Sequence, residues 1–211
     1  MTRVVVRRVA EVLATAPEAT DWLSLSEQTR LLRLRVVARR DQYLAGHWLL
    51  RRLLAEHHAV DPRDVSLIER ENLPPAVAGS VLEVSLSHGG DWISAAWSAA
   101  AIGIDLEPRT PRPGLDRLQQ LLLNPDELPG SLDNDALLQR WVLKEALIKR
   151  EHASALPEQL AALQLRPAAG KGEVEILSSA DWHLALAPAG IDEVDTGLPL
   201  LARSRWAVQG V

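Results

Sequence analysis

The segment Ile102–Glu107, which reads Ile-Gly-Ile-Asp-Leu-Glu, constrains the fold more than any other part of the chain. Its apolar residues alternate with Gly103, Asp105 and Glu107, and alternate residues of a β-strand lie on one face. We therefore predict a strand whose apolar face joins a core and whose other face carries two carboxylates. Carboxylates this close repel each other unless a cation compensates, either a divalent ion or an arginine or lysine. Two solvated acids at an exposed strand end also explain the segment.

A helical pattern over 137–150 supplies a third acid. Its apolar residues form a stripe, and Glu145 falls within this stripe, four residues after Trp141. A carboxylate on the core-facing side of a helix must be paired or bound to a metal ion. An ion pair with Lys149 at the i,i+4 spacing is the simpler explanation, but it suits a polar helix face better than this one.

The three acids together predict a metal site made of Asp105, Glu107 and Glu145. Carboxylates without thiolates or a histidine cluster favour Mg²⁺, with Mn²⁺ as the alternative. Lys144 and Lys149 flank Glu145 and supply positive charge for a phosphate group. The residues thus predict an enzyme that acts on a phosphate-containing substrate.

The order of the predicted elements indicates an α+β fold. A capping box at Ser24–Glu27 begins a helical region that extends to about His57, with a break expected near Arg40 or Asp41. Further helices are predicted at 115–123 and 135–152, and strands at 65–69, 81–87, 92–97, 101–107, 163–166, 174–177, 182–187 and 206–209. Helices followed by strands occur twice, which predicts two similar α+β halves, 1–100 and 101–211, although no sequence repeat supports this symmetry.

Composition limits the classes of partner. The chain has 211 residues, enough for one large or two small domains. No apolar run reaches the ~20 residues that span a bilayer, and the first residues lack the apolar core of a secretion signal. Without cysteine there are no disulfides and no thiolate metal sites, so we expect a cytoplasmic protein. The net charge of −5 argues against nucleic acid or a membrane surface as partner.

The stretch Ser85–Trp92 contains a Ser-His-Gly-Gly sequence at the end of a predicted strand. Small residues let backbone N–H groups approach an oxyanion, and His88 can donate a hydrogen bond to a phosphate. A turn with a capping serine is the alternative explanation for this stretch by itself. The G-x-S-x-G elbow of hydrolases, the phosphate loop and the dinucleotide fingerprint do not occur in the sequence.

Three segments, in this order, resemble the Sfp-type 4′-phosphopantetheinyl transferases. They are Ser85–Trp92 (SLSHGGDW), Gly103–Glu107 (GIDLE) and Trp141–Lys149 (WVLKEALIK), and the resemblance extends over about Arg30–Arg150. It implies a monomer with a pseudo-twofold fold of two similar α+β halves. In such a fold the N-terminal half contacts the phosphates and adenine of coenzyme A, and the C-terminal half holds the metal-binding acids and the Lys-Glu helix.

The resemblance also implies a reaction of the holo-[acyl-carrier-protein] synthase type. The family transfers the 4′-phosphopantetheine group of coenzyme A to a serine hydroxyl of an acyl or peptidyl carrier protein. The reaction depends on Mg²⁺ and releases 3′,5′-ADP. By this resemblance Asp105, Glu107 and Glu145 bind the metal ion. The catalytic residues are Glu145, Lys149 and His88, and Glu145 assists deprotonation of the serine.

The coenzyme A contacts come from the same resemblance. The sequence departs from the family at Gln42, where a basic residue often contacts the 3′-phosphate, so Arg40 or Arg39 is expected to take that role. The stretch Asn72–Pro74, expected near the adenine, lacks the family's lysine. Glu127 is either near the water shell of the metal or a solvated acid. The residues assigned to coenzyme A are Ser87, His88, Lys144, Lys149, Arg40 and Pro74.

Two other functions fit part of the pattern. One is a non-catalytic module of the same fold that binds carrier proteins, and the other is a Mg²⁺-dependent phosphohydrolase. The intact set of three acids and two lysines argues against the non-catalytic module. Whether the carrier belongs to fatty acid, polyketide or nonribosomal peptide biosynthesis depends on surface shape and charge, which one sequence does not show.

Overall fold

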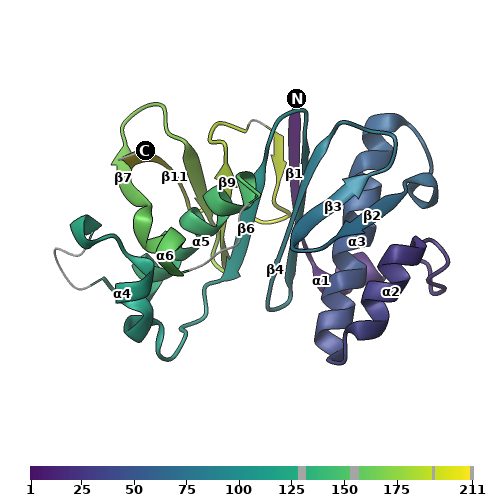
Figure 1. Cartoon of the computed structure of the whole chain (residues 1–211), viewed down its shortest axis with the longest axis horizontal. Helices are drawn as coiled ribbons and strands as arrows, with labels where there is room; N and C mark the ends of the chain where they lie inside the picture. The colour runs from purple at the N-terminus through teal and green to yellow at the C-terminus, as the bar shows by residue number, and fades with distance from the viewer. Residues whose placement is uncertain (128–131, 153–156, 192, 210–211) are drawn as a thin grey trace. The chain divides into compact units, whose positions relative to one another are not determined.

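The computed structural model describes residues 1–127, 132–152, 157–191 and 193–209. The chain divides into two compact units (Figure 1). Unit 1 comprises Met1–Ile102 and the short strand β10 (Glu193–Asp195), and unit 2 begins at Gly103 and resumes at Leu198. Each unit combines helices with a sheet, so the predicted α+β class is confirmed. The predicted pseudo-twofold similarity of two halves stays a prediction.

Unit 1 contains helices and a sheet of four strands. Its helices are α1 (Val9–Leu13), α2 (Leu25–Arg33), α3 (Val37–His58) and the 3-10 turn η1 (Pro62–Asp64). Its strands are β1 (Thr2–Arg8), β2 (Leu67–Arg70), β3 (Leu73–Val77), β4 (Glu83–Gly89), β5 (Trp92–Ser98) and β10. The sheet has the order β10-β1-β5-β4, with β10 parallel to β1 and the other pairs antiparallel, and β2 and β3 form a separate ribbon.

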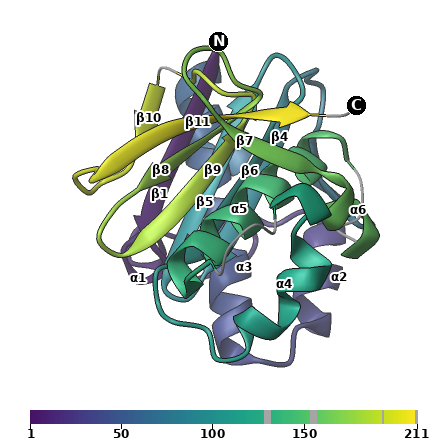
Figure 2. The same ribbon diagram turned by 90° about the vertical axis from the view of Figure 1, so that its left-hand side faces the viewer.

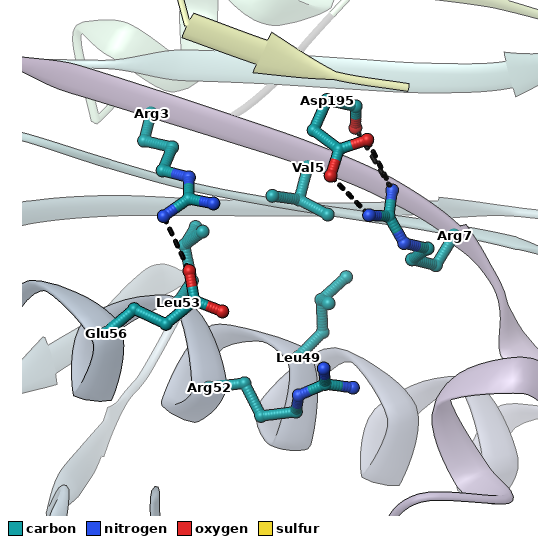
Figure 3. A pocket seen from close by; sticks show the side chains of 8 residues that line it. All are labelled: Arg3, Val5, Arg7, Leu49, Arg52, Leu53, Glu56 and Asp195. Atoms are coloured by element: carbon teal, nitrogen blue, oxygen red, sulfur yellow. Dashed lines mark hydrogen bonds and ion pairs between the residues drawn. The ribbon is translucent and has the colours of Figure 1, made fainter. Parts of the chain in front are cut away.

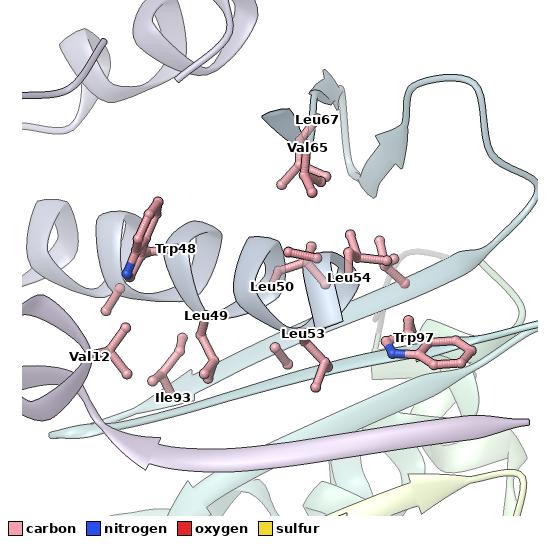
Figure 4. Packing of buried hydrophobic residues seen from close by; sticks show 14 of the residues in the cluster. Val12, Trp48, Leu49, Leu50, Leu53, Leu54, Val65, Leu67, Ile93 and Trp97 are labelled. Carbon is pink, nitrogen blue, oxygen red and sulfur yellow. The ribbon is translucent and has the colours of Figure 1, made fainter. Parts of the chain in front are cut away.

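Helix α3 is buried on two sides, which explains why apolar residues occur around much of its circumference. Leu49 and Leu53 pack toward Ile93 on the sheet, whereas Leu50 lies on the opposite side, toward Leu67 (Figure 4). These residues belong to one core that fills unit 1.

The predicted capping box at Ser24 is present and does more than begin α2. The Glu27 carboxylate accepts a hydrogen bond from the Ser24 N–H at 2.8 Å. The same fully buried carboxylate accepts from Arg51 at 2.5 Å and from His47 at 2.7 Å. Burial alone raises the pKa of Glu27, but hydrogen bonds from His47 and Arg51 lower it to about 2. One carboxylate therefore both begins α2 and joins it to α3.

The break between the two helices lies earlier than the predicted position near Arg40. It falls between the end of α2 at Arg33 and the start of α3 at Val37. The backbone N–H groups of Arg39 and Arg40 both donate to the carbonyl of Val36, so these arginines already belong to the first turn of α3.

Ion pairs hold strand β10 on β1. Arg7 pairs with Asp195, and Arg3 pairs with both Glu193 of β10 and Glu56 of α3. Arg3, Arg7, Glu56 and Asp195 line a cavity of about 50 Å³ next to apolar residues of β1 and α3 (Figure 3). These pairs join the first strand to a segment near the end of the chain.

Unit 2 is built on an antiparallel sheet of five strands. They are β6 (Gly103–Pro108), β7 (Gln164–Ala168), β8 (Val174–Ser178), β9 (Trp182–Ala187) and β11 (Ala202–Gln209), in the order β6-β9-β8-β11-β7. Its helices are α4 (Gln119–Leu122), α5 (Asn134–Arg150) and α6 (Pro157–Ala162), with the 3-10 turns η2 (Leu115–Leu118) and η3 (Pro125–Glu127). No helix in the described part of the chain has the length and apolar character needed to span a membrane.

Helix α5 lies across β6 and β9 (Figure 2). Its residues Val142 and Ala146 share a core with Ile176 and Ala185 of the sheet. A second cluster packs the helix against α4 and α6. The helix is therefore enclosed between the sheet and two shorter helices.

The contact between α5 and β6 is closest at Gly103. A Cβ atom added there would lie 2.0 Å from the carbonyl oxygen of Ala146 and 2.4 Å from the backbone nitrogen of Arg150. Because both neighbours are backbone atoms of the helix, they cannot move aside as a flexible side chain can. Glycine is required here for space rather than for an unusual backbone conformation.

We predict that Gly103→Ala separates α5 from β6 and lowers the free energy of unfolding by about 3 kcal/mol. Urea denaturation followed by tryptophan fluorescence measures the change. Gly170→Ala is the matched control, because no atom lies within 4 Å of the Cβ that it would add. Equal stability of the two variants would contradict the prediction.

Candidate active site

Strand β6 and helix α5 bring the three predicted acids into one region of unit 2. Asp105 and Glu107 share a face of β6 with Gly103, and the close approach at Gly103 shows that α5 covers this face. The acids therefore lie under a helix rather than at an exposed strand end, and Asp105 is only 5% exposed. Glu145 comes from α5 and is half-buried.

Two basic side chains already pair with the acids of β6. Lys149 Nζ of α5 donates to Asp105 Oδ1 at 2.7 Å. The Arg112 guanidinium, from the segment after β6, donates to Glu107 Oε2. The side chain of Glu145 forms neither a hydrogen bond nor an ion pair with the residues that the structure describes. We call Asp105, Glu107 and Glu145 the acid cluster.

Burial and the nearby Asp105 carboxylate raise the pKa of the other two acids of this cluster. Burial, then the nearby Asp105 carboxylate, raises the pKa of Glu145 to about 6, although Lys149 opposes the shift. Burial and Asp105 also raise the pKa of Glu107, and Arg112 opposes that shift. The cluster therefore holds more negative charge than its two basic neighbours offset.

This donor set fits a hard divalent cation. Carboxylate oxygens are the ligands that Mg²⁺ and Mn²⁺ prefer, and a divalent ion would relieve the repulsion that raises the pKa of Glu145. Across the described ranges, no three acidic or histidine side chains already converge on one metal position. In this arrangement Lys149 and Arg112 supply the positive charge, so a metal ion would have to rearrange at least one of them.

Lys144 lies apart from the acid cluster, although the sequence assigned it to coenzyme A. It is fully buried and donates to the carbonyl of Leu122 at 2.8 Å and to Glu127 at 2.5 Å. The same Glu127 carboxylate accepts from the N–H of Leu165 at 3.1 Å. Glu127 is thus a buried partner of Lys144 and not a solvated acid. Contact between Lys144 and a phosphate would require it to leave this pairing.

The predicted coenzyme A residues of unit 1 lie on β3, β4 and α3. His88 is exposed near the end of β4, and its Nδ1 lies 3.1 Å from Arg39 Nη1, while Ser87 is buried. Arg40 Nη1 donates to the carbonyl of Leu34 at 3.5 Å, and the carbonyl of Pro74 accepts from Arg70. Their contacts with coenzyme A stay predictions.

Gln42, which departs from the family pattern, has a structural role. Its Nε2 donates to the carbonyl of Gly90 at 2.8 Å, and its Oε1 accepts from Arg39 at 3.2 Å. Because Arg39 also contacts His88, one network of polar contacts joins the start of α3 to the end of β4. This arrangement places Arg39, rather than Arg40, beside His88.

Two features of the region were missed in the sequence. One is Arg112, for which only the flanking prolines were a signal. The other is a chain of contacts at the start of α5: Asp135 binds Arg109 at 3.0 Å and His183 at 3.0 Å, and His183 Nδ1 lies 2.7 Å from Ser178 Oγ. Burial lowers the pKa of His183, although Asp135 opposes the shift. Because Ser178 and His183 are buried, we interpret this chain as an anchor of α5 on β9.

Comparison with known proteins agrees with the chemistry of the acid cluster. Over 157 aligned residues the chain is 29% identical to a phosphopantetheinyl transferase of a Thraustochytrium species, an alignment that covers 64% of this chain and 54% of that protein. The chain is homologous to phosphopantetheinyl transferases. It is also 28% identical over 138 residues to a 4′-phosphopantetheinyl transferase of Bacillus pumilus, with 61% and 57% covered. The chain spans about half the length of these relatives, and no protein-family model matches it.

We predict that Glu145→Gln stabilises the metal-free protein at neutral pH but not in acid. Folding raises the pKa of Glu145 from 4.5 to about 6. At a pH above both values the carboxylate is ionised and destabilises the folded protein, whereas at a pH below both values it is protonated and has no such effect. Allowing for solvent screening of this half-buried group, we expect a gain of about 1 kcal/mol near pH 7.5 and almost none near pH 4. Denaturant unfolding in EDTA at both pH values measures this, and a variant less stable than wild type at the higher pH would contradict it.

We predict that Lys144→Met lowers the free energy of unfolding by about 3 kcal/mol, because the buried Glu127 carboxylate loses its hydrogen-bonded lysine and keeps only the more distant Arg140, at 3.7 Å, as a charged partner. Adding Glu127→Gln to the same protein should recover part of the loss. Lys171→Met, at an exposed lysine of the same unit, is the matched control in chemical denaturation. Unchanged stability of Lys144→Met would favour a role for Lys144 at the ligand instead.

Proposed function

We propose that this chain transfers the 4′-phosphopantetheine group of coenzyme A to a serine hydroxyl of an acyl or peptidyl carrier protein. The observation that carries the proposal is the crowding of Asp105, Glu107 and Glu145 where α5 covers β6, with Lys149 among them. Homology to two phosphopantetheinyl transferases supports the same reaction. We place the protein among Mg²⁺-dependent transferases on this basis.

The chemistry requires charge neutralisation and positioning more than a reactive side chain. A Mg²⁺ ion held by Asp105, Glu107 and Glu145 would supply positive charge to the diphosphate of coenzyme A. Lys149 adds a second positive charge from α5. The serine oxygen forms a bond to the β-phosphorus, the bond from that phosphorus to the bridging oxygen breaks, and 3′,5′-ADP leaves.

We assign Glu145 as the general base that accepts the proton of the attacking serine hydroxyl. A general base must lie within reach of the proton that it accepts, and the side chain of Glu145 forms no hydrogen bond or ion pair with the described residues, which leaves its carboxylate oxygens able to accept one. Its carboxylate is also half-buried, so part of it is open to an incoming group. In the proposal His88, Ser87, Arg40 and Pro74 remain contacts of coenzyme A.

The test is mass spectrometry of apo carrier proteins after incubation with the purified chain, coenzyme A and Mg²⁺. A panel of acyl and peptidyl carriers is needed because the sequence does not identify the carrier. We expect at least one carrier to gain the mass of one phosphopantetheine group. Glu145→Gln should reduce the rate by about 100-fold or more, while Glu158→Gln, at an exposed glutamate of the same unit, should not reduce it.

The alternative functions give different results in the same assay. If every carrier stays unmodified, the proposal is wrong. Release of 3′,5′-ADP from coenzyme A without a carrier would indicate a phosphohydrolase. Carrier binding without either product would indicate a non-catalytic module. If Glu145→Gln stays active, Glu145 does not accept the proton of the serine, but the proposed transfer reaction still stands.

A further inference from the structure

Arg112 is one of the two basic neighbours of the acid cluster, and hydrogen bonds to its backbone fix its position. Its N–H donates to Asn134 Oδ1 at 3.1 Å, and its carbonyl accepts from Asn134 Nδ2 at 3.0 Å. Pro111 and Pro113 on either side limit the backbone further, because a proline ring restricts φ. The first residue of α5 therefore holds Arg112 from both sides, and its guanidinium reaches Glu107 Oε2.

The pair of Arg112 and Glu107 conflicts with a metal ion on the same carboxylate. A divalent ion takes oxygen lone pairs and places two positive charges beside the guanidinium. The guanidinium group cannot relieve this repulsion by losing its proton, because arginine side chains stay protonated in proteins. The guanidinium must therefore move away, and its side chain, 35% exposed, has access to solvent to do so.

We propose that Arg112 is a resident counter-cation of Glu107, which a divalent ion must displace, so that Arg112 sets the affinity of the acid cluster for that ion. This inference rests on the proposed function, because it takes Glu107 as a metal ligand. Metal binding is then an exchange of one cation for another, and the metal-free protein is not left with an uncompensated Glu107.

The direct test is isothermal titration calorimetry of the metal-free protein with MgCl₂. Arg112→Ala removes the competing cation, and we expect the dissociation constant for Mg²⁺ to fall by about two- to fivefold, the loss of one partly exposed ion pair. An unchanged or weaker affinity in Arg112→Ala overturns the inference.

Arg109→Ala is the matched control, because Arg109 lies three residues earlier but pairs with Asp135, outside the acid cluster. If Arg112 weakened Mg²⁺ binding only through long-range electrostatic repulsion, removal of the nearby Arg109 would also strengthen Mg²⁺ binding. We expect Arg109→Ala to leave the affinity unchanged. Equal tightening in both variants overturns direct competition at Glu107.

Thermal unfolding gives a second readout that does not depend on activity. Arg112→Ala should be less stable than wild type in EDTA, where Arg112 pairs with Glu107, and this deficit should shrink in saturating Mg²⁺. A deficit of the same size in both conditions would mean that Arg112 only supports the fold, and the inference would be wrong.

The results separate this inference from the proposed function. If wild-type protein binds Mg²⁺ and modifies a carrier, but Arg112→Ala binds the ion no more tightly, only the inference fails. If wild-type protein takes up no Mg²⁺ and modifies no carrier, the proposed function fails, and the inference fails with it.

Discussion

The arrangement of unit 2 depends on the absence of a side chain at Gly103. Because a Cβ atom would collide with backbone atoms of α5, only glycine lets the helix lie directly on β6. This approach brings Glu145 and Lys149 of the helix to Asp105 and Glu107 of the strand. It also covers the acid face of β6, which removes water from the carboxylates and raises the pKa of Glu107 and Glu145. Packing and electrostatics of the candidate site therefore have one origin.

Gathering like charges under a helix costs stability, and the protein offsets this cost with its own cations. Lys149 pairs with Asp105 and Arg112 pairs with Glu107, while Glu145 keeps a pKa near neutrality. A carboxylate that resists ionisation near pH 6 is poorly suited to hold a fold together but well suited to accept a proton or a metal ion. The destabilising feature of the cluster is thus the same feature that supports a catalytic function.

Two lysines of one short segment have different surroundings for a geometric reason. Residues five apart on an α-helix point in directions separated by about 140°. Lys149 points to Asp105 on the sheet, whereas Lys144 points to Glu127 and to the carbonyl of Leu122, the last residue of α4. The segment reads as one motif in the sequence, yet one lysine serves the acid cluster and the other joins α5 to the preceding segment.

The sequence by itself determined the α+β class, the strand at Ile102–Glu107 with its acids on one face, the helix that carries Glu145, and the resemblance to phosphopantetheinyl transferases. Periodicity is sufficient for these features because it depends on neighbours within one element. Only the tertiary structure decided that α5 covers the acid face, that Lys144 pairs with Glu127, and that Arg112 reaches Glu107. Periodicity assigns a residue to a face but does not say which element packs on that face, and the partner of a buried charge is set by that packing.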